Sequence, residues 1–128
     1  MSNWTHVAAI FRVDYCHLYD HKPDFSKIFG QELDYYSARE IFFEADKHPE
    51  KFLPFGSEGS LKMSVWENPD RYCLAAYTVS VFGDLRDHYS IEEIMNWFDE
   101  KCKLISIRQA VITVSNEYYG TQTKTYEG

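Results

Sequence analysis

The chain has 128 residues, 45% of them hydrophobic and 17% aromatic, and it carries a formal net charge of −7 at pH 7. This length fits one domain, residues 1–128, with a core of its own, and the composition excludes a disordered or fibrous chain. The acidic balance disfavours binding to nucleic-acid phosphates, and no apolar run is long enough to cross a membrane.

The first half of the chain predicts one strand and a series of short helices. Residues 6–14 are apolar and β-branched, which is typical of a largely covered central strand. Asp24 is expected to cap a short helix that stops at Gly30. Residues 37–48 contain helix formers and end before Pro49, which itself can start one further helical turn.

The middle of the chain predicts a β-hairpin between two loops. Residues 61–67 alternate between apolar and polar side chains, and residues 72–82 form the strongest strand signal in the chain. A turn signal at 68–71 joins them, because proline presets a turn angle there. Residues 56–60 and 83–89, rich in glycine and charge, predict the flanking loops.

The last third predicts a capped helix and a final strand. Ser90 and Glu93 have the spacing of a capping box, ahead of an amphipathic helix that ends near Leu104. Residues 106–115 form the last long strand. The tail, 116–128, keeps alternating threonine with polar residues, so it either extends that strand or folds back beyond Gly120.

The element order β-α-β-β-α-β predicts an α+β fold, a ferredoxin-like sandwich with a four-stranded antiparallel sheet and two helices on one face. The expected strand order is 4-1-3-2, with the first and third strands in the middle. These are the two most apolar strands of the sequence, which agrees with central positions.

The other face of this sheet is expected to be an apolar patch, and such patches usually mark contacts. Sheet-to-sheet homodimerisation is the simplest way to cover it; the alternative is that the C-terminal tail or the long first connection folds over it. Trp66, Tyr77 and Tyr118 are candidate anchors for a protein partner. The predicted interface residues are Ile10, Trp66, Leu74, Ala76 and Val111, with Phe82 beside them.

Two loops of the predicted fold, 56–60 and 83–89, meet at one end of the sheet and suggest a ligand site. His88 could act as an acid or base oriented by Asp84 or Asp87, with Arg86 for an anionic substrate. The competing interpretation is a solvated turn with local ion pairs. The candidate ligand-binding residues are Ser57, Glu58, Asp84, Arg86, Asp87 and His88, near Ser60 and Tyr118.

The opposite end carries side chains of the types that bind metals, but not in a metal-binding pattern. His17 and His21 are four apart, a spacing that puts two ligands on one face only in a helix, and this segment reads as a loop. Asp14, Cys16 and Asp20 lie nearby, and no second pair completes a tetrahedral site. We therefore expect no metal and no cofactor.

The cysteine pattern indicates a reducing environment. Cys16, Cys73 and Cys102 are odd in number and have no paired spacing. The opening residues 1–5 lack the basic and apolar regions of a signal peptide. We therefore expect a cytoplasmic protein.

Residues 56–88 (GSEGSLKMSVWENPDRYCLAAYTVSVFGDLRDH) and 107–114 (IRQAVITV) resemble small proteins carried by phages and mobile elements of Firmicutes. The resemblance implies a short accessory or counter-defence protein rather than a metabolic enzyme.

The first hypothesis is therefore a non-enzymatic protein-interaction module that forms a homodimer or binds a foreign protein, with no nucleic acid and no membrane as partner. Mimicry of nucleic acid is a narrower form of it. The alternative is a small-molecule or anion-binding protein, or a modest enzyme, with its site at the 56–60 and 83–89 loops.

Overall fold

The computed structural model describes residues 3–14, 23–33, 47–68, 75–88 and 90–128. Its elements, in chain order, are β1 (Trp4–Asp14), α1 (Phe25–Phe29), the 3-10 helix η2 (Pro49–Lys51), β2 (Lys62–Glu67), β3 (Ala75–Arg86), α3 (Ile91–Leu104), β4 (Ile107–Asn116) and β5 (Gly120–Glu127). The predicted helix 37–48 and turn 68–71 fall largely outside the described residues.

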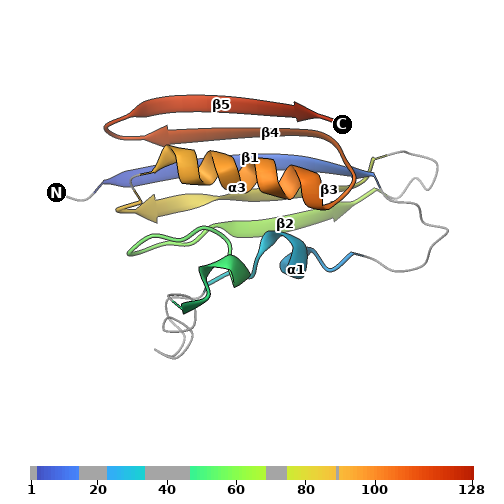
Figure 1. Ribbon diagram of the computed structural model, residues 1–128, viewed down its shortest axis with the longest axis horizontal. Helices are drawn as coiled ribbons and strands as arrows, with labels where there is room; N and C mark the ends of the chain where they lie inside the picture. The colour runs from blue at the N-terminus through green and yellow to red at the C-terminus, as the bar shows by residue number, and fades with distance from the viewer. Residues whose placement is uncertain (1–2, 15–22, 34–46, 69–74, 89) are drawn as a thin grey trace.

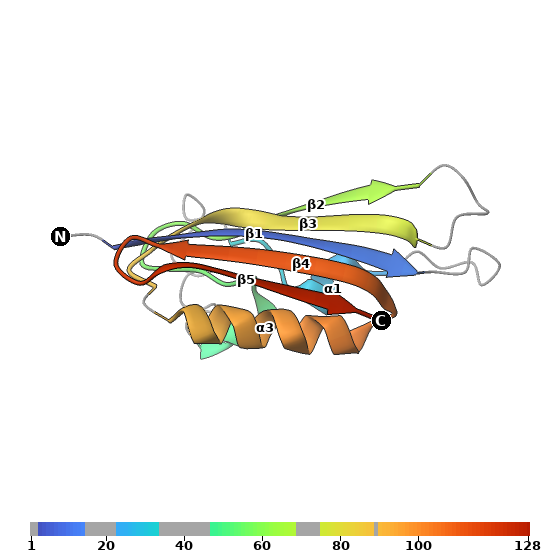
Figure 2. The same cartoon turned by 90° about the horizontal axis from the view of Figure 1, so that it is seen from above.

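The strands form one sheet in the order β2-β3-β1-β4-β5, and every neighbouring pair is antiparallel. The long helix α3 crosses one face of this sheet, and the short helix α1 lies on the same face (Figures 1 and 2). Within the described chain, no element lies on the other face (Figure 2).

The predicted four-stranded ferredoxin-like sandwich is wrong, because the sheet has a fifth strand. The first four strands do take the expected order 4-1-3-2, but the tail pairs with β4 as β5 and makes β4 an internal strand. Asn116 sets the turn: its side-chain oxygen accepts hydrogen bonds from the backbone N–H groups of Tyr118 (2.9 Å) and Tyr119 (3.1 Å). Gly120 then takes a φ of +80°, which closes the hairpin.

The core lies between the sheet and the helices. Along β1, every second side chain from Thr5 to Val13 is buried, as its alternation predicts. Phe11 lies at the centre, with ring centroids 4.8 Å from Phe29, 5.3 Å from Phe98 and 6.0 Å from Trp97. A single aromatic ring therefore joins β1, α1 and α3.

Both helix starts are confirmed at the capping residue. The Asp24 side chain accepts a hydrogen bond from the backbone N–H of Lys27 (3.2 Å), and Gly30 follows α1 with a φ of +124°. Ser90 accepts one from the backbone N–H of Glu93 (3.1 Å) at the start of α3. These local signals fix the helix boundaries because they satisfy free amides of the first turn.

The predicted loop at 83–89 is largely strand. β3 continues to Arg86, and its last residues pair with the start of β1, where Leu85 lies opposite Thr5. Leu85 is fully buried, so the helix-facing alternation of β3 persists through a stretch that looks polar in sequence. The chain leaves the sheet only at Asp87, which has a φ of +56°.

Glycines in the 56–60 loop allow it to lie directly against the end of β3. The backbone N–H of Arg86 donates to the carbonyl of Glu58, and its own carbonyl accepts from the N–H of Ser57 (both 2.9 Å). A Cβ on Gly59, whose φ is +80°, would lie 2.1 Å from the carbonyl oxygen of Asp84. The loop therefore requires glycine for a close backbone approach.

Candidate functional site

The sheet face opposite the helices carries four exposed apolar side chains, spread over three neighbouring rows of the sheet. Ile10 is 44% exposed, Val111 37%, Phe82 47% and Trp66 55%, although all four lie in regular strands. Of the other predicted interface residues, Leu74 lies outside the described residues, and Ala76 lies in β3 without a described side chain. We call the outward residues of the five strands the open face.

The centre of the open face is a cross-strand apolar pair. Ile10 in β1 lies opposite Val111 in β4, and on its other side opposite Ser80 in β3. One row along, Phe82 lies opposite Ala8 and Lys62. Arg12 and Gln109 flank this pair on one side and also border the hollow over β1 and β4. Many of the other open-face residues are short and neutral: Ser64, Thr78, Ser80, Thr113, Ser115, Thr121, Thr123 and Thr125.

The charges of the open face balance, unlike those of the whole chain. We consider the rows of the open face that pair with β1 between His6 and Arg12. Their cations are Arg12 and Lys62, and their anions are Asp84 and Glu127. Asp84 is paired with His6 at 2.6 Å. The net charge of −7 therefore comes from other surfaces of the protein.

A hollow lies at one side of the open face, and a projecting ring lies at the other. The hollow, about 250 Å³, is bordered by Ile10, Val111, Thr125 and Glu127 over β1, β4 and β5. Trp66 projects from the opposite edge strand, β2, in the same row of the sheet as Glu127. The proposed anchor Tyr77, in contrast, is buried beneath the sheet, where its ring is 5.2 Å from that of Phe25.

Four of the predicted ligand-binding residues bond mainly to one another. Arg86 lies 3.1 Å from the carboxylate of Glu58 and 3.7 Å from that of Asp87. The Ser57 hydroxyl donates to Asp87 (3.2 Å), which also accepts from the backbone N–H of Asn3 (3.1 Å). Because two carboxylates lie beside its guanidinium, Arg86 is poorly placed to bind an anionic substrate.

The remaining two candidates lie on opposite sides of the sheet. Asp84 lies on the open face with His6, whereas His88 lies on the helix side of the sheet, 3.6 Å from Glu93. The expected acid–base pairing of His88 with Asp84 or Asp87 is therefore replaced by Glu93, and the structure divides the predicted site into three separate places. Ser60 is buried and accepts from the backbone N–H of Leu33, and Tyr118 is exposed in the β4–β5 turn.

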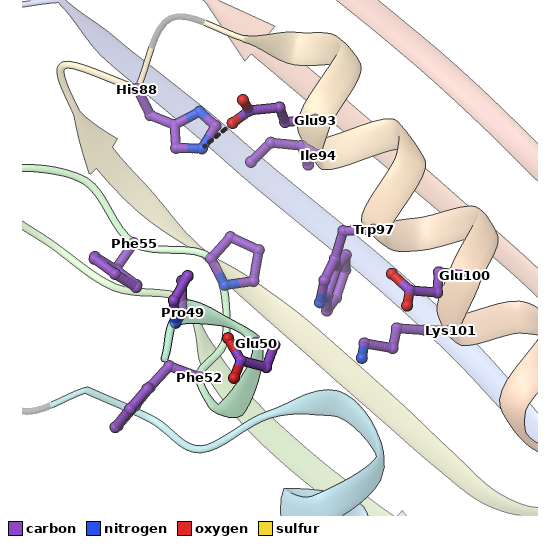
Figure 3. A pocket seen from close by; sticks show the side chains of 11 residues that line it. Pro49, Glu50, Phe52, Phe55, His88, Glu93, Ile94, Trp97, Glu100 and Lys101 are labelled. Carbon is purple, nitrogen blue, oxygen red and sulfur yellow. Dashed lines mark ion pairs between the residues drawn. The ribbon is translucent and has the colours of Figure 1, made fainter. Parts of the chain in front are cut away.

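His88 borders a cleft of about 410 Å³ between α3 and the segment 49–55 (Figure 3). Burial lowers the pKa of His88 below its usual value of 6.5, and the nearby Glu93 carboxylate opposes this only in part. The sequence alone did not predict this cleft. Trp97, a large aromatic residue at a partly exposed position of α3, is the feature that could have indicated a binding surface there. Its lining residues are Pro49, Glu50, Phe52, Pro54, Phe55, His88, Glu93, Ile94, Trp97, Glu100 and Lys101.

The described residues contain no group of His, Cys, Asp and Glu side chains that could hold a metal ion. Cys16, His17, Asp20 and His21 lie outside them, and Asp14 lies 3.9 Å from Arg108. Cys102 is buried on α3, which raises its thiol pKa to about 11 and leaves it protonated and unreactive at neutral pH. In the described chain, no helix has the length and apolar character needed to cross a membrane.

Comparison with family models, with curated proteins and with solved structures gave no match. The candidate sites are therefore judged on their own geometry, which offers two surfaces: the open face and the cleft beside Trp97.

Proposed function

We propose that this chain is a non-enzymatic protein-interaction module that works as a homodimer, with two open faces packed against each other. The observation that carries this proposal is the exposed Ile10–Val111 pair at the centre of a regular sheet. An uncovered apolar sheet face is costly in water, and burial against another surface recovers about 25 cal/mol for each Å² of apolar area.

The size of the open face suits a dimer. Five strands about 4.8 Å apart and seven residues long at about 3.3 Å each cover roughly 500 Å² on each copy. Two copies would bury about 1,000 Å², without counting the extra surface of projecting side chains, and this is the smallest area expected of a specific interface. Its charge also permits a second copy, because Arg12 and Lys62 balance Asp84 and Glu127, so that two open faces carry no net charge against each other.

The hollow and the projecting ring support one arrangement of the two copies. A two-fold axis parallel to β1 would place β2 of each copy over β5 of the other, because these strands are the opposite edges of the sheet. Trp66 of each copy would then lie over the hollow beside Thr125 and Glu127 of the other. This contact occurs twice, as the symmetry of a homodimer requires.

The test is the solution mass by light scattering, from about 1 to about 200 µM, a range that covers micromolar self-association. The variants are Val111→Lys, at the centre of the face, and Thr121→Lys, which adds the same charge at an outer position of the same face. We expect the wild type and Thr121→Lys to be dimeric and Val111→Lys to be monomeric with an unchanged circular dichroism spectrum. A monomeric wild type, or a dimer that survives Val111→Lys, overturns the proposal.

The resemblance of residues 56–88 and 107–114 to small phage-borne proteins fits this kind of activity. An accessory or counter-defence protein acts by contact, and a dimer presents two identical copies of any further binding surface. The alternative, an enzyme at the 56–60 and 83–89 loops, loses support because Arg86 is paired and His88 lies apart from it.

A further inference from the structure

The cleft between α3 and the segment 49–55 has an aromatic wall. Trp97 projects from α3 into the cleft, and Phe55 and two prolines, Pro49 and Pro54, line the side formed by the segment 49–55 (Figure 3). Phe52 also borders the cleft, but its ring is buried in a small cluster with Leu33 and Phe55. Flat rings and prolines can hold the aliphatic stem of a long side chain, and the face of an indole attracts a cation within about 6 Å. The wall therefore suits a guest with an extended stem and a positive head.

Carboxylates surround this wall. Glu50 lies on the 49–55 side, Glu93 at one end of the helical side and Glu100 near the other (Figure 3). Among the described residues that line the cleft, Lys101 is the one permanent cation, and it lies beside Glu100. The rim therefore keeps an excess of negative charge next to a large aromatic surface.

His88 does not cancel this excess. Because burial lowers its pKa, the imidazole is neutral at pH 7. Its Nδ1 and the indole Nε1 of Trp97 are both buried without a hydrogen-bond partner in the described chain. Such unsatisfied groups are uncommon in native proteins. Of the two, only the His88 nitrogen could accept a hydrogen bond from a cationic guest, because the indole N–H is itself a donor.

From the aromatic wall and the acidic rim together, we infer that this cleft binds an arginine or lysine side chain of a partner protein. The stem would lie along Trp97 and the prolines Pro49 and Pro54, and the charged head would be placed among Glu50, Glu93 and Glu100. The net charge of −7 favours this class of partner, because it raises the encounter rate with basic surfaces. The cleft lies on the helix side of the sheet, so this binding is independent of the homodimer proposed above.

The test is an NMR titration of the full chain with the blocked tripeptide acetyl-Gly-Arg-Gly-amide. The same tripeptide with citrulline, which has the shape of arginine but no charge, is the matched neutral probe. We expect the Trp97 indole N–H signal to move with saturation in the millimolar range for the arginine peptide only. Equal shifts with the citrulline peptide, or no saturable shift with the arginine peptide, would overturn the proposal.

Variants locate the binding. Trp97→Leu is expected to weaken binding at least fivefold, read from the amide signals of residues 49–55, and Glu100→Gln to weaken it two- to fivefold. Glu92→Gln removes the same charge from an exposed position of α3 outside the cleft and should change the affinity less than twofold. Equal losses in Glu92→Gln and Glu100→Gln would mean nonspecific attraction to an acidic surface. The Val111→Lys variant should still bind, so the two proposals can fail separately.

Discussion

Ile10 of β1 and Val111 of β4 lie directly opposite each other in the middle of the sheet, yet both side chains point away from the helices and remain more than one-third exposed. Apolar cross-strand pairs normally contribute to a sheet by being covered, at about 0.2–1 kcal/mol for each pair. The exposure of this pair is the observation on which the proposed dimer rests.

The first prediction concerns Trp66, the ring that would enter the hollow of the second copy. Trp66→Ala should weaken dimerisation at least thirtyfold, because a buried tryptophan anchor contributes about 2 kcal/mol or more. Analytical ultracentrifugation measures the change in dissociation constant. Lys62→Ala, on the same edge strand, should change it less than about threefold. Similar effects of the two variants would exclude the proposed two-fold axis.

The second prediction separates two glycines with the same backbone angle. Gly59 and Gly120 both have a φ of +80°, but a Cβ at Gly59 would meet the Asp84 carbonyl oxygen at 2.1 Å, whereas nothing lies within 4 Å at Gly120. Gly120→Ala should therefore cost only the left-handed backbone term, about 1 kcal/mol. Gly59→Ala should cost about 3 kcal/mol or displace the 56–60 loop.

Urea unfolding at one fixed protein concentration measures both free energies, since self-association would otherwise shift them. Equal losses for Gly59→Ala and Gly120→Ala would show that the loop does not depend on its close approach to β3.

The third prediction concerns Asn116, a buried side chain that connects three parts of the fold. It caps the β4–β5 turn and donates to the Thr5 hydroxyl (2.9 Å), which in turn donates to the carbonyl of His88 (2.6 Å). Asn116→Ala should destabilise the protein by about 2–3 kcal/mol and Thr5→Val by about 1–2 kcal/mol. Because the two residues share a hydrogen bond, the double variant should lose less than the sum, and a fully additive result in urea unfolding would contradict this.

The range over which a hydrogen bond acts along the chain decides which elements the sequence predicts. Local signals were sufficient for α1 and α3, because Asp24 and Ser90 act on the backbone within three residues of themselves. The sequence alone does not place β5, because its alternation has no apolar face: Thr121, Thr123 and Thr125 point one way, and Gln122 and Lys124 the other. Its position depends on the Asn116 turn, on the ion pair of Lys124 with Asp99 of α3 and on Tyr126 at the margin of the core.

The candidate ligand site failed as a single site for a related reason. Asp84 and His88 are four residues apart, which suggests one loop, but β3 continues through Asp84 and the chain turns only at Asp87. Strand alternation places Asp84 on the open face, and the turn takes His88 to the helix side, where Glu93 meets it. Burial of Leu85 causes this division, and its depth depends on contacts far away in the sequence.

The fourth prediction is a pH effect at His88. Burial lowers its pKa in the folded state, so the unfolded chain takes up a proton first as the pH falls through about 6.5. His88 therefore does not reduce the free energy of unfolding above that pH. As the pH falls from 6.5 to the lower folded pKa, the free energy of unfolding decreases progressively. The melting temperature of the wild type should fall more between pH 7.5 and 5.5 than that of His88→Gln.

The cause of the shift is tested by an NMR titration of Glu93→Gln. This variant should lower the His88 pKa further, because it removes the carboxylate 3.6 Å away, and a rise in that pKa would contradict the assigned cause.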